Sequence, residues 1–435
     1  DTTKRIDGRA GGRIGRRFSG GLCVEVGVDT LAQAHYSNGA NASSSHSGKP
    51  RDSDARTASP GLLKLHVWAP AFTGFGGGIG VFSREMALAL SDLGHVVRPF
   101  GKMDKPGPLR DRRIAEANDL PGPVRTAAFA GSCLAAIARE RPDYVISTHV
   151  NFGPVALLAK RMFGTPFTLV AHGIDIHSRL PRMTLAALRY ADRVVAVSQW
   201  TRARVLSLGG IDASRVVIVP NTFNELNFGV APPVEYLSKR YELEPDDKVV
   251  LTVARLDPGE RYKGYDRILE ALPSLLAECG KVRFIVAGQG GDRQRAEGIA
   301  AELGVSQAVT FAGFVPDAEL ADHYRLADAF AMPSVGEGFG IVFLEAMACG
   351  TPVLAGNRDG SVDALDGGRL GKLVNPDDAA EIADGIAQLL HRRGPDLWFD
   401  RQALHEAVVD RFGRAAFRET LRGVLSGLPP RVLPA

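Results

Sequence analysis

The sequence has few of the features that mark secreted, metal-binding or membrane-spanning proteins. Its 435 residues contain four cysteines, scattered without a CxxC pair, so the sequence indicates neither a disulfide framework nor a zinc site. A reducing cytoplasm is the simplest compartment for such a chain. No apolar run approaches the roughly eighteen residues that a membrane helix needs. Dense Lys/Arg stripes with interleaved aromatic residues are also missing, which argues against nucleic acid as a partner.

Two common nucleotide-binding motifs are missing as well. The run Phe75-Gly-Gly-Gly-Ile-Gly80 follows the first expected strand, but Val81 occupies the position of the third glycine in G-x-G-x-x-G. The second expected strand continues into Pro99-Phe-Gly-Lys102, so no acidic residue ends it to hold an NAD ribose. No G-x-x-x-x-G-K-[ST] sequence occurs. The sequence therefore argues against nicotinamide and P-loop enzymes, while the glycine run fits either an anion site at a helix N-terminus or a tight turn.

The net charge of +3 is unevenly distributed along the chain. Residues 1–60 carry nine Lys/Arg and six Asp/Glu, residues 61–235 carry twenty and thirteen, and residues 236–435 carry twenty-three and thirty, which gives +3, +7 and −7. The basic first half favours contact with something anionic, such as a phospholipid surface or a lipid-phosphate acceptor. Ordinary scatter in surface composition explains the same numbers, and both interpretations stay open.

The chain divides into three parts. Residues 1–60 are low in complexity and poor in apolar residues, so we expect a disordered tail or a misassigned start. Residues 61–235 and 236–435 each alternate short apolar runs with helical segments, the rhythm of parallel βαβ units. We therefore predict an α/β protein with two tandem, Rossmann-like, doubly wound parallel sheets facing each other across a cleft. Strands are expected at 63–69, 96–97, 143–147, 167–171, 193–197, 248–253, 282–287, 309–311, 329–332 and 352–355. The expected helices include 79–93, 379–391 and 400–427. A hinge between the two halves is expected at 229–234.

A charged loop, Arg255-Leu-Asp-Pro-Gly-Glu-Arg-Tyr-Lys-Gly264, follows an expected strand and so lies at its carboxyl end. The planar guanidinium of Arg255 and the compact ammonium of Lys263 suit a diphosphate. The alternative is a solvated loop with an internal Arg–Glu pair. The sequence Asp52-Ser-Asp54 has the form of a metal motif, but it lies in the expected tail, so we expect no metal site.

Two carboxylates, Glu337 and Glu345, stand in an otherwise apolar, glycine-marked run from 333 to 353. Glu337 is expected in a loop above a strand end, and Glu345 in the following helix, which begins near Gly340. Since charged side chains are rarely buried without a partner, we expect each acid to accept hydrogen bonds from adjacent hydroxyls of a sugar. The alternatives are an exposed helix face for Glu345 and an acid at a helix start for Glu337.

Glu337 and Glu345 resemble the E-x7-E signature of glycosyltransferase family 4, whose members are retaining enzymes with the GT-B fold. The resemblance covers residues 63–427 and implies an acceptor-side domain at 61–235 and a nucleotide-sugar-binding domain at 236–435, with the final helices packing back toward the first domain. Its motifs, in family order, are GGGIGVFSRE (76–85), AHGIDIHS (171–178), VAVSQWTRARV (195–205), VPNTF (219–223), ARL and ERYKGYD (254–266), VAGQG (286–290) and PSVGEGFGIVFLEAMACG (333–350).

This resemblance also implies the site residues. A diphosphate would be held by cationic side chains and by amides of the glycine loop, and these groups are Arg255, Lys263, Gly77 and Gly78. The ribose and the transferred sugar would be held by Glu345 and by Glu337 with the amides after it, and His172 would bond to the sugar on its reactive side. The implied catalytic residues are His172, Arg255, Lys263 and Glu337; the implied donor-binding residues are Gly77, Gly78, Arg255, Lys263, Glu337, Gly338, Phe339, Gly340 and Glu345.

The chain departs from the usual family pattern in places. Lys263 follows Arg255 by eight positions instead of five, which makes Arg261 a second candidate for the phosphate role. Asn221 is followed by Thr-Phe rather than Gly-Val/Ile-Asp, and Asp175 stands where many members have other residues. These differences bear on the identity of the donor more than on activity.

The predicted activity is the transfer of a hexosyl group from a nucleotide-diphosphate sugar to a hydroxyl acceptor with retention of configuration, in glycan, exopolysaccharide or glycolipid synthesis. No cofactor or metal is expected. The acceptor is a glycan, a lipid-linked molecule or a small molecule, and the enzyme is expected in the cytoplasm, with peripheral contact to the inner face of the membrane through its basic N-terminal domain. The alternatives are a sugar-nucleotide epimerase of the same fold and a catalytically silent sugar-nucleotide-binding protein; a phosphorylase would need a pyridoxal-phosphate lysine, for which no segment is evident.

Overall fold

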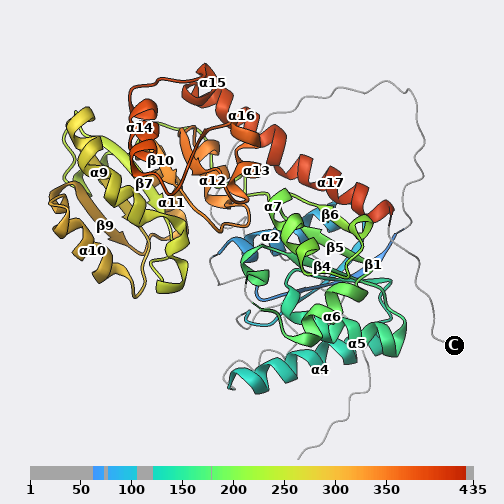
Figure 1. Ribbon diagram of the computed structural model, residues 1–435. Coiled ribbons are helices and arrows are strands. Elements are labelled where there is room, and N and C mark those ends of the chain that lie inside the picture. Colours follow the sequence, from blue (N-terminus) through green and yellow to red (C-terminus); the bar gives the residue numbers. More distant parts are fainter. Residues whose placement is uncertain (1–61, 73–76, 105–120, 178, 428–435) are drawn as a thin grey trace, which may run out of the picture.

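The computed structural model of the chain describes residues 62–72, 77–104, 121–177 and 179–427 (Figure 1). Two parallel sheets form the framework, as the sequence predicts, and each has six strands, one more than expected. The expected tail at 1–60, its Asp52-Ser-Asp54 sequence and the first two residues of the glycine run lie outside the described residues. Among the described residues, no helix combines the length and the apolar character needed to cross a bilayer.

The first sheet has the strand order β2-β1-β3-β4-β5-β6. Its strands are almost entirely buried on both faces, because helices cover each side, and this explains their continuous apolar sequences. The strands are β1 (Lys64–Ala69), β2 (Val96–Gly101), β3 (Tyr144–Ser147), β4 (Phe167–Ala171), β5 (Arg193–Ala196) and β6 (Val216–Ile218). The helices between them are α2 (Gly78–Asp92), α4 (Gly122–Glu140), α5 (Gly153–Phe163), α6 (Arg182–Tyr190) and α7 (Gln199–Ser207).

The second sheet has the order β12-β11-β10-β7-β8-β9. Its strands are β7 (Lys248–Val253), β8 (Val282–Ala287), β9 (Val309–Gly313), β10 (Ala329–Met332), β11 (Val353–Gly356) and β12 (Lys372–Val374). Its helices are α8 (Glu235–Arg240), α9 (Tyr265–Cys279), α10 (Arg293–Glu302), α11 (Asp317–Leu326), α12 (Ile341–Ala348), α13 (Ser361–Ala364), α14 (Ala379–Leu390) and α15 (Asp396–Phe399). The ten predicted strands are confirmed; the second is longer than expected. No helix or strand lies between β6 and α8, where the hinge at 229–234 is expected.

Each sheet has a point at which the direction of strand winding reverses. In the first sheet this point lies between β1 and β3, and in the second between β7 and β10. The loops that leave the two strands at such a point go to opposite faces and open a crevice at the carboxyl ends, where ligands of doubly wound sheets bind. The charged loop at 255–264 leaves β7, and the loop that carries Glu337 leaves β10. The fold therefore places both predicted ligand loops at one switch point.

The chain ends in two helices, α16 (Arg401–Phe412) and α17 (Arg414–Ser426), where the sequence predicts one helix over 400–427. The break falls at Gly413, whose backbone is extended (φ −67°, ψ 173°). A Cβ atom there would lie 2.4 Å from both the Val409 carbonyl oxygen and Glu225 Oε1. The carboxylate of Glu225 also accepts a hydrogen bond from the backbone N–H of Arg414, which caps the second helix. The prediction of a single helix was wrong because this contact comes from a distant residue.

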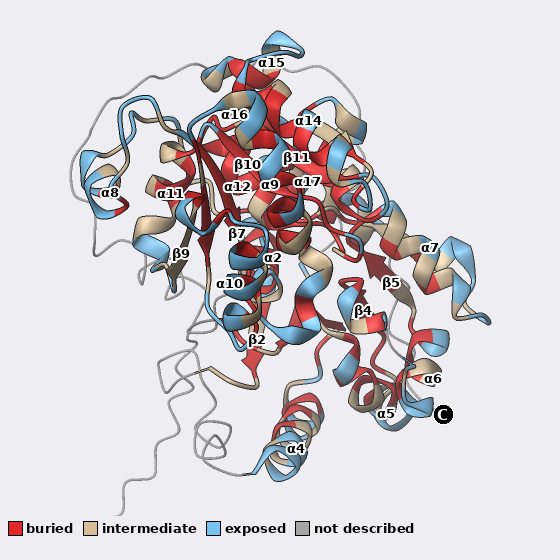
Figure 2. Ribbon diagram, turned by 60° about the vertical axis from the view of Figure 1, so that its left-hand side comes forward, coloured by how far each residue is buried: buried red, intermediate tan, exposed pale blue. Residues whose placement is uncertain are grey.

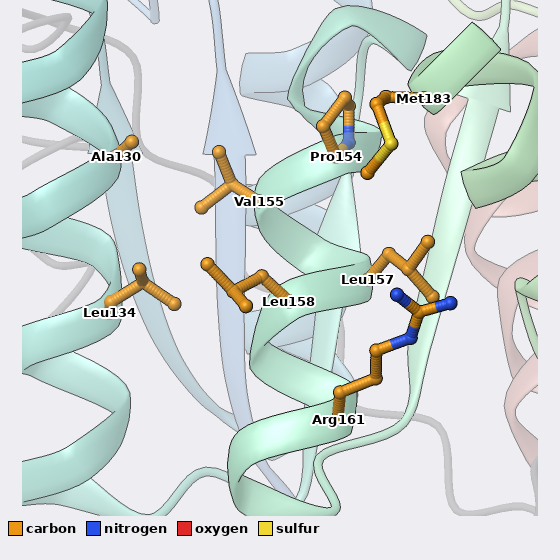
Figure 3. Close-up of a pocket in the computed structure, with 8 residues that line it drawn as sticks. All are labelled: Ala130, Leu134, Pro154, Val155, Leu157, Leu158, Arg161 and Met183. Atoms are coloured by element: carbon orange, nitrogen blue, oxygen red, sulfur yellow. The ribbon is translucent and has the colours of Figure 1, made fainter.

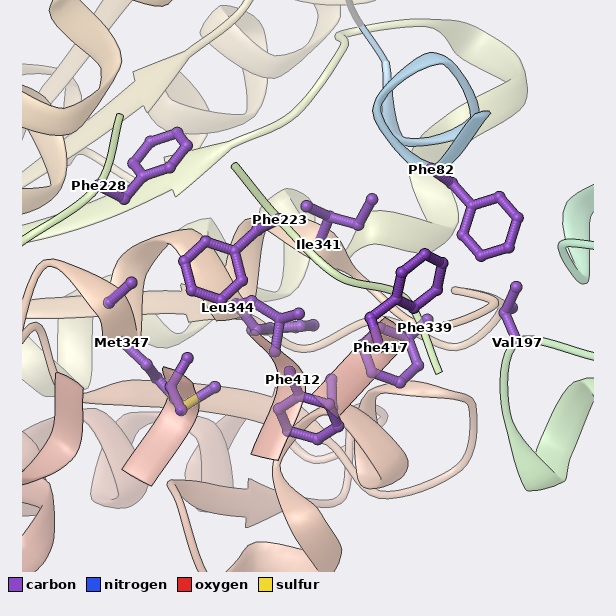
Figure 4. Packing of buried hydrophobic residues seen from close by; sticks show 14 of the residues in the cluster. Phe82, Val197, Phe223, Phe228, Phe339, Ile341, Leu344, Met347, Phe412 and Phe417 are labelled. Carbon is purple, nitrogen blue, oxygen red and sulfur yellow. The ribbon is translucent and has the colours of Figure 1, made fainter. Parts of the chain in front are cut away.

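α17 packs along α2 of the first half, while α16 packs on α12 of the second half. Phe417 meets the ring of Phe82 edge-on, with ring centroids 5.7 Å apart. Phe412 meets Phe339 in the same way at 5.6 Å. One continuous cluster of buried apolar side chains therefore includes residues of both sheets and of both final helices (Figure 4).

Candidate active site

The predicted cation Lys263 lies beside the predicted sugar-binding acid Glu337. Its Nζ atom donates a hydrogen bond to Glu337 Oε2 at 3.1 Å, and both side chains are mostly buried, with exposed fractions of 16% and 19%. The backbone makes this approach possible at Gly264, where φ is +80° and a Cβ atom would lie 2.2 Å from the Pro333 carbonyl oxygen. Two segments that are 74 positions apart in sequence thus meet at the switch point of the second sheet.

The insertion between the two predicted cations forms a 3-10 turn, Pro258–Lys263. Asp257 caps this turn by accepting the backbone N–H of Gly259 at 2.8 Å. The turn places the carboxylate of Glu260 between the two cations, in an ion pair with Arg255 and with its other oxygen 4.0 Å from Lys263 Nζ. The internal Arg–Glu pair considered from the sequence is therefore present, and Arg255 itself remains 73% exposed.

The loop that carries Glu337 is held by a buried carboxylate that the sequence analysis missed. Asp359, which is 2% exposed, accepts hydrogen bonds from the backbone N–H of Glu337 and from Ser334 Oγ, both at 2.8 Å. It also accepts the backbone N–H of Ser361 at 3.0 Å. A signal for this role was present, because the polar run Asn-Arg-Asp-Gly-Ser directly follows β11 and so lies at a strand's carboxyl end.

The first half of the molecule contacts this loop through His172 and Gly173, which follow β4. A Cβ atom on Gly338 would lie 1.7 Å from the His172 carbonyl oxygen, so only glycine allows this backbone approach. Thr201, at the start of α7, adds a hydrogen bond from its hydroxyl to the Gly338 carbonyl oxygen at 3.3 Å. The structure therefore brings His172 of the first half against the Glu337 loop of the second.

His172 is held in one tautomer. Its Nε2 lies 2.9 Å from the carbonyl oxygen of Thr148, which can only accept, so Nε2 donates and Nδ1 is left as an acceptor. Burial lowers the pKa of His172 to about 3, and the imidazole is therefore neutral at pH 7. The ring also stands edge-on to Phe82, with centroids 5.0 Å apart. A neutral, fixed imidazole can accept a hydrogen bond from a hydroxyl but cannot supply a positive charge.

Asp175, noted as unusual from the sequence, holds the loop after His172. Its Oδ1 accepts the backbone N–H of His172 at 2.9 Å. Burial raises the pKa of Asp175 to about 6. The departure from the family pattern thus lies directly beside the predicted sugar-contacting residue.

The glycine loop and the loop after β10 also face each other. Gly77 precedes α2, and the position of a Cβ atom on Gly78 lies 3.4 Å from Ile341 Cδ1, at the start of α12. Phe339 is buried against Phe412, and Gly340 is the residue at which α12 begins. The N-terminal ends of α2 and α12 therefore lie close together, and helix N-termini favour anions.

Glu345 is not part of the loop contacts that bring the other predicted residues together. It lies in the middle of α12, is 8% exposed, and accepts a hydrogen bond from the hydroxyl of Tyr324 at 2.9 Å. Burial raises the pKa of Glu345 to about 7. No sequence signal pointed to this tyrosine of α11 as its partner, because the two residues belong to separate elements.

Arg261, the second candidate for the phosphate role, faces another acid. Its guanidinium donates to Asp292 Oδ1 at 2.6 and 3.0 Å, and Arg295 and Tyr265 bond to the same carboxylate. These four side chains form a network that connects the charged loop with α9 and α10. Within the described residues, no group of three or more His, Cys, Asp or Glu side chains is arranged to hold a metal ion.

Two doubly wound parallel sheets whose loops meet across the two halves define the GT-B fold. Residues 76–225 match the family described as Glycosyltransferase Family 4, and residues 234–405 match Glycosyl transferases group 1. A D-inositol 3-phosphate glycosyltransferase of Gordonia bronchialis is 30% identical over 374 residues, which cover 76% of this chain and 80% of the relative. The chain belongs to glycosyltransferase family 4, and it is a hexosyltransferase that uses a nucleotide sugar.

Three further proteins are similar to this chain, one in sequence and two in fold. A GDP-mannose-dependent alpha-(1-6)-phosphatidylinositol monomannoside mannosyltransferase of Mycobacterium tuberculosis is 34% identical over 252 residues, or 54% of this chain and 64% of that protein. Among solved structures, sucrose-phosphate synthase from Thermosynechococcus elongatus superposes with a TM-score of 0.67 at 22% identity, covering 83% of this chain and 98% of the other. The HepE protein of Anabaena in complex with UDP gives 0.64 at 19% identity, covering 84% and 100%. These structures show the same fold.

Proposed function

We propose that Lys263 and Arg255 bind the diphosphate of the sugar donor and that Glu337 binds hydroxyls of the transferred hexose. The observation that carries this assignment is the contact between Lys263 and Glu337 at the switch point of the second sheet, next to His172 of the first half. A bound diphosphate would compete for the ammonium group that Glu337 now holds. The freed carboxylate would then accept hydrogen bonds from the sugar. Binding of the diphosphate to Lys263 would thus also make Glu337 available to the hexose.

The chemical step that we propose is the front-face displacement that membership of the family implies. The bond between the anomeric carbon and the diphosphate oxygen breaks while the acceptor oxygen forms its bond on the same face of the sugar. The acceptor proton passes to the departing diphosphate, and the cations of Lys263 and Arg255 stabilise the charge that develops there. His172, neutral and fixed by Thr148, accepts a hydrogen bond from the sugar through Nδ1. The amides after Glu337 and those of Gly77 and Gly78 hold the donor, and Glu345 holds its ribose.

We propose a GDP-sugar as the donor and a phosphorylated inositol, free or in a lipid, as the acceptor. The support is the pair of relatives, one a D-inositol 3-phosphate glycosyltransferase and the other a GDP-mannose-dependent enzyme acting on a phosphatidylinositol mannoside. The basic first half, at +7 over residues 61–235, agrees with an anionic acceptor. We assign residues 61–235 to the acceptor side and residues 236–435 to the donor side, and we place the enzyme in the cytoplasm with peripheral contact to the membrane.

The test is a ligand screen on the full chain. GDP-, UDP- and ADP-sugars are added at a range of concentrations, and binding is measured by calorimetry together with the release of nucleotide diphosphate. We expect one nucleotide class to bind at micromolar concentration and to be turned over when inositol phosphate is added, with the product showing the donor's anomeric configuration by NMR. Binding of no nucleotide sugar would overturn the assignment of the site. Turnover of a donor into an epimer without an acceptor would favour the epimerase instead.

A further inference from the structure

A groove lies on the side of the first sheet that faces away from the second sheet. α4, α5 and α6 lie together on this side (Figures 1 and 2). The groove has a volume of about 300 Å³, and Figure 3 shows Ala130 and Leu134 of α4 opposite Val155 and Leu158 of α5. Arg161 is the charged residue of its lining. None of these residues belongs to the proposed site, so the transferase chemistry does not explain the groove.

Large apolar side chains remain exposed around the groove. Leu158 is 44% exposed, Met162 and Met183 are each 53% exposed, and Tyr190 is 59% exposed. Together with Val124 of α4, they make up five of the fourteen large apolar or aromatic side chains that are exposed in the described part of the chain. Such a concentration on three neighbouring helices marks a surface that contacts something apolar.

The same three helices are strongly basic. Their single acid is Glu140, whose side chain is 13% exposed and bonds to His66 at 3.1 Å. Asp143 and Asp192, in the loops that leave α4 and α6, accept the backbone N–H groups at the starts of β1 and β4. The surface therefore presents cations around an apolar centre without an exposed acid on these helices. Its basic residues are Arg125, Arg139, Lys160, Arg161, Arg182 and Arg189; of these, Arg139 is paired with Glu140 and Lys160 with Asp192.

We propose that the face formed by α4, α5 and α6 docks on the surface of an anionic phospholipid bilayer. Leu158, Met162 and Met183 enter the boundary between headgroups and acyl chains, while Arg161 and its basic neighbours bind lipid phosphates. A second copy of the chain is a poorer occupant, because a symmetric dimer would place the same cations opposite each other. This face would make the membrane contact that is part of the proposed function. The proposed docking rests on that contact alone and not on the proposed donor, acceptor or catalytic residues.

Co-sedimentation of the full chain with lipid vesicles tests this proposal. We expect binding to vesicles of phosphatidylcholine with phosphatidylglycerol, little binding to phosphatidylcholine alone, and a loss of binding as salt is raised. Arg161→Gln should weaken binding about fivefold, the effect of one positive charge near such a surface. The double variant Leu158→Ser, Met162→Ser should weaken it at least tenfold. Both leave buried residues untouched, so circular dichroism should show a folded protein.

Matched controls come from exposed residues of the second half. Lys239→Gln on α8 and Leu303→Ser after α10 remove a cation and an apolar side chain elsewhere, and vesicle binding should stay unchanged. Equal binding to neutral and anionic vesicles, no binding, or equal losses in the control variants would overturn the proposal. So would a dimer in solution that the Leu158, Met162 double variant dissociates. Nucleotide release from a soluble donor, measured without vesicles, tests the catalytic site separately and should not change in any of these variants.

Discussion

At the scale of single residues, the proposed site is a set of cations and carboxylates that pair with one another. Lys263 lies between the carboxylates of Glu260 and Glu337, and Arg255 pairs with Glu260. A cation that is mostly buried is stable only with such partners. The two acids therefore hold the cations in place. If these cations bind the diphosphate as proposed, replacing one should affect the chemical step most strongly.

We expect Lys263→Gln to lower kcat by about a hundredfold to a thousandfold, because one charged donor to the leaving group is lost. Donor affinity should fall as well, since Glu337 is then left without its cation. The measurement is steady-state release of nucleotide diphosphate. Arg267→Gln is the matched control. Arg267 lies four residues after Lys263, in the first turn of α9, where its side chain is exposed and paired with Glu270. A Lys263 variant with the activity of this control would contradict the proposed role.

Glu345 should give donor binding a pH dependence. Its pKa is raised by burial to about 7, whereas His149 and His172, with pKa values lowered by burial to about 4 and about 3, stay neutral between pH 6 and 8. If the carboxylate must be ionised to accept two ribose hydroxyls, donor affinity should fall about tenfold from pH 8 to pH 6. Glu345→Gln should bind the donor weakly and without this dependence, as measured by calorimetry.

Protonation of Glu345 affects the free energy of unfolding in the direction opposite to that of an acid whose pKa is lowered by folding. Between pH 4.5 and about 7 the native state holds the proton of Glu345 that the unfolded chain releases, so its contribution to the free energy of unfolding falls as pH rises. Glu345→Gln should remove this fall. A wild-type affinity that is flat from pH 6 to 8 would show that Glu345 does not bind the donor as an anion.

At the scale of elements, the loop between β10 and α12 is the segment that residues of both halves contact. Asp359 holds it from the second half, and His172 and Thr201 contact it from the first. Its position is fixed by close backbone contacts, which leave no room for an added Cβ atom. A change of one methyl group should therefore be visible in stability and in donor binding.

We expect Gly338→Ala to destabilise the protein by about 1–3 kcal/mol and to reduce donor affinity, because the new Cβ atom would collide with the His172 carbonyl oxygen. Thermal unfolding and calorimetry measure the two effects. Gly423→Ala in α17, where a Cβ atom meets nothing within 4 Å, is the matched control and should be neutral or slightly stabilising. Equal behaviour of the two variants would contradict the close approach.

Sequence patterns predicted the elements well because parallel strands buried on both faces are continuous apolar runs, as in β4, β7 and β8. They failed where a tertiary contact decides the outcome, as at Gly413, where the helix breaks against Glu225. The sequence placed Lys263 and Glu337 at strand ends that face one cleft, but it did not predict that the two side chains bond to each other. The place of Asp359 after β11 was a signal that the sequence analysis missed. The bond between Tyr324 and Glu345 could not be assigned, because hydrogen bonds between separate elements leave no periodic trace in a sequence.

At the scale of the whole molecule, the two halves are joined by polar contacts as well as by the shared apolar cluster. Arg414 at the start of α17 lies 3.6 Å from Glu85 of α2, and burial raises the pKa of Glu85. The backbone N–H of Gln199 donates to Asp363 Oδ1 at 3.1 Å. These contacts set the orientation in which His172 meets the Glu337 loop.

We expect Arg414→Gln to lower the free energy of unfolding by about 1–2 kcal/mol, because Glu85 loses a cation while it stays buried. Adding Glu85→Gln should recover part of this loss, since the buried charge is then removed too. Urea unfolding of the single and double variants measures the coupling. Arg422→Gln, exposed on the same helix and paired with Glu419, is the control. Strict additivity of the Arg414 and Glu85 substitutions would contradict the pairing.

The course of α17 also bears on how the polypeptide matures on the ribosome. Residues of α2 leave the exit tunnel early, whereas Phe417, Leu421 and Leu425, which lie on the helix that packs on α2, are translated more than three hundred residues later. The surface of α2 that α17 covers therefore stays open while the second half is synthesised. Fragments that stop short of α17 should be captured by chaperones or precipitate, and the first half of a nascent chain should gain protease resistance only after α17 has emerged.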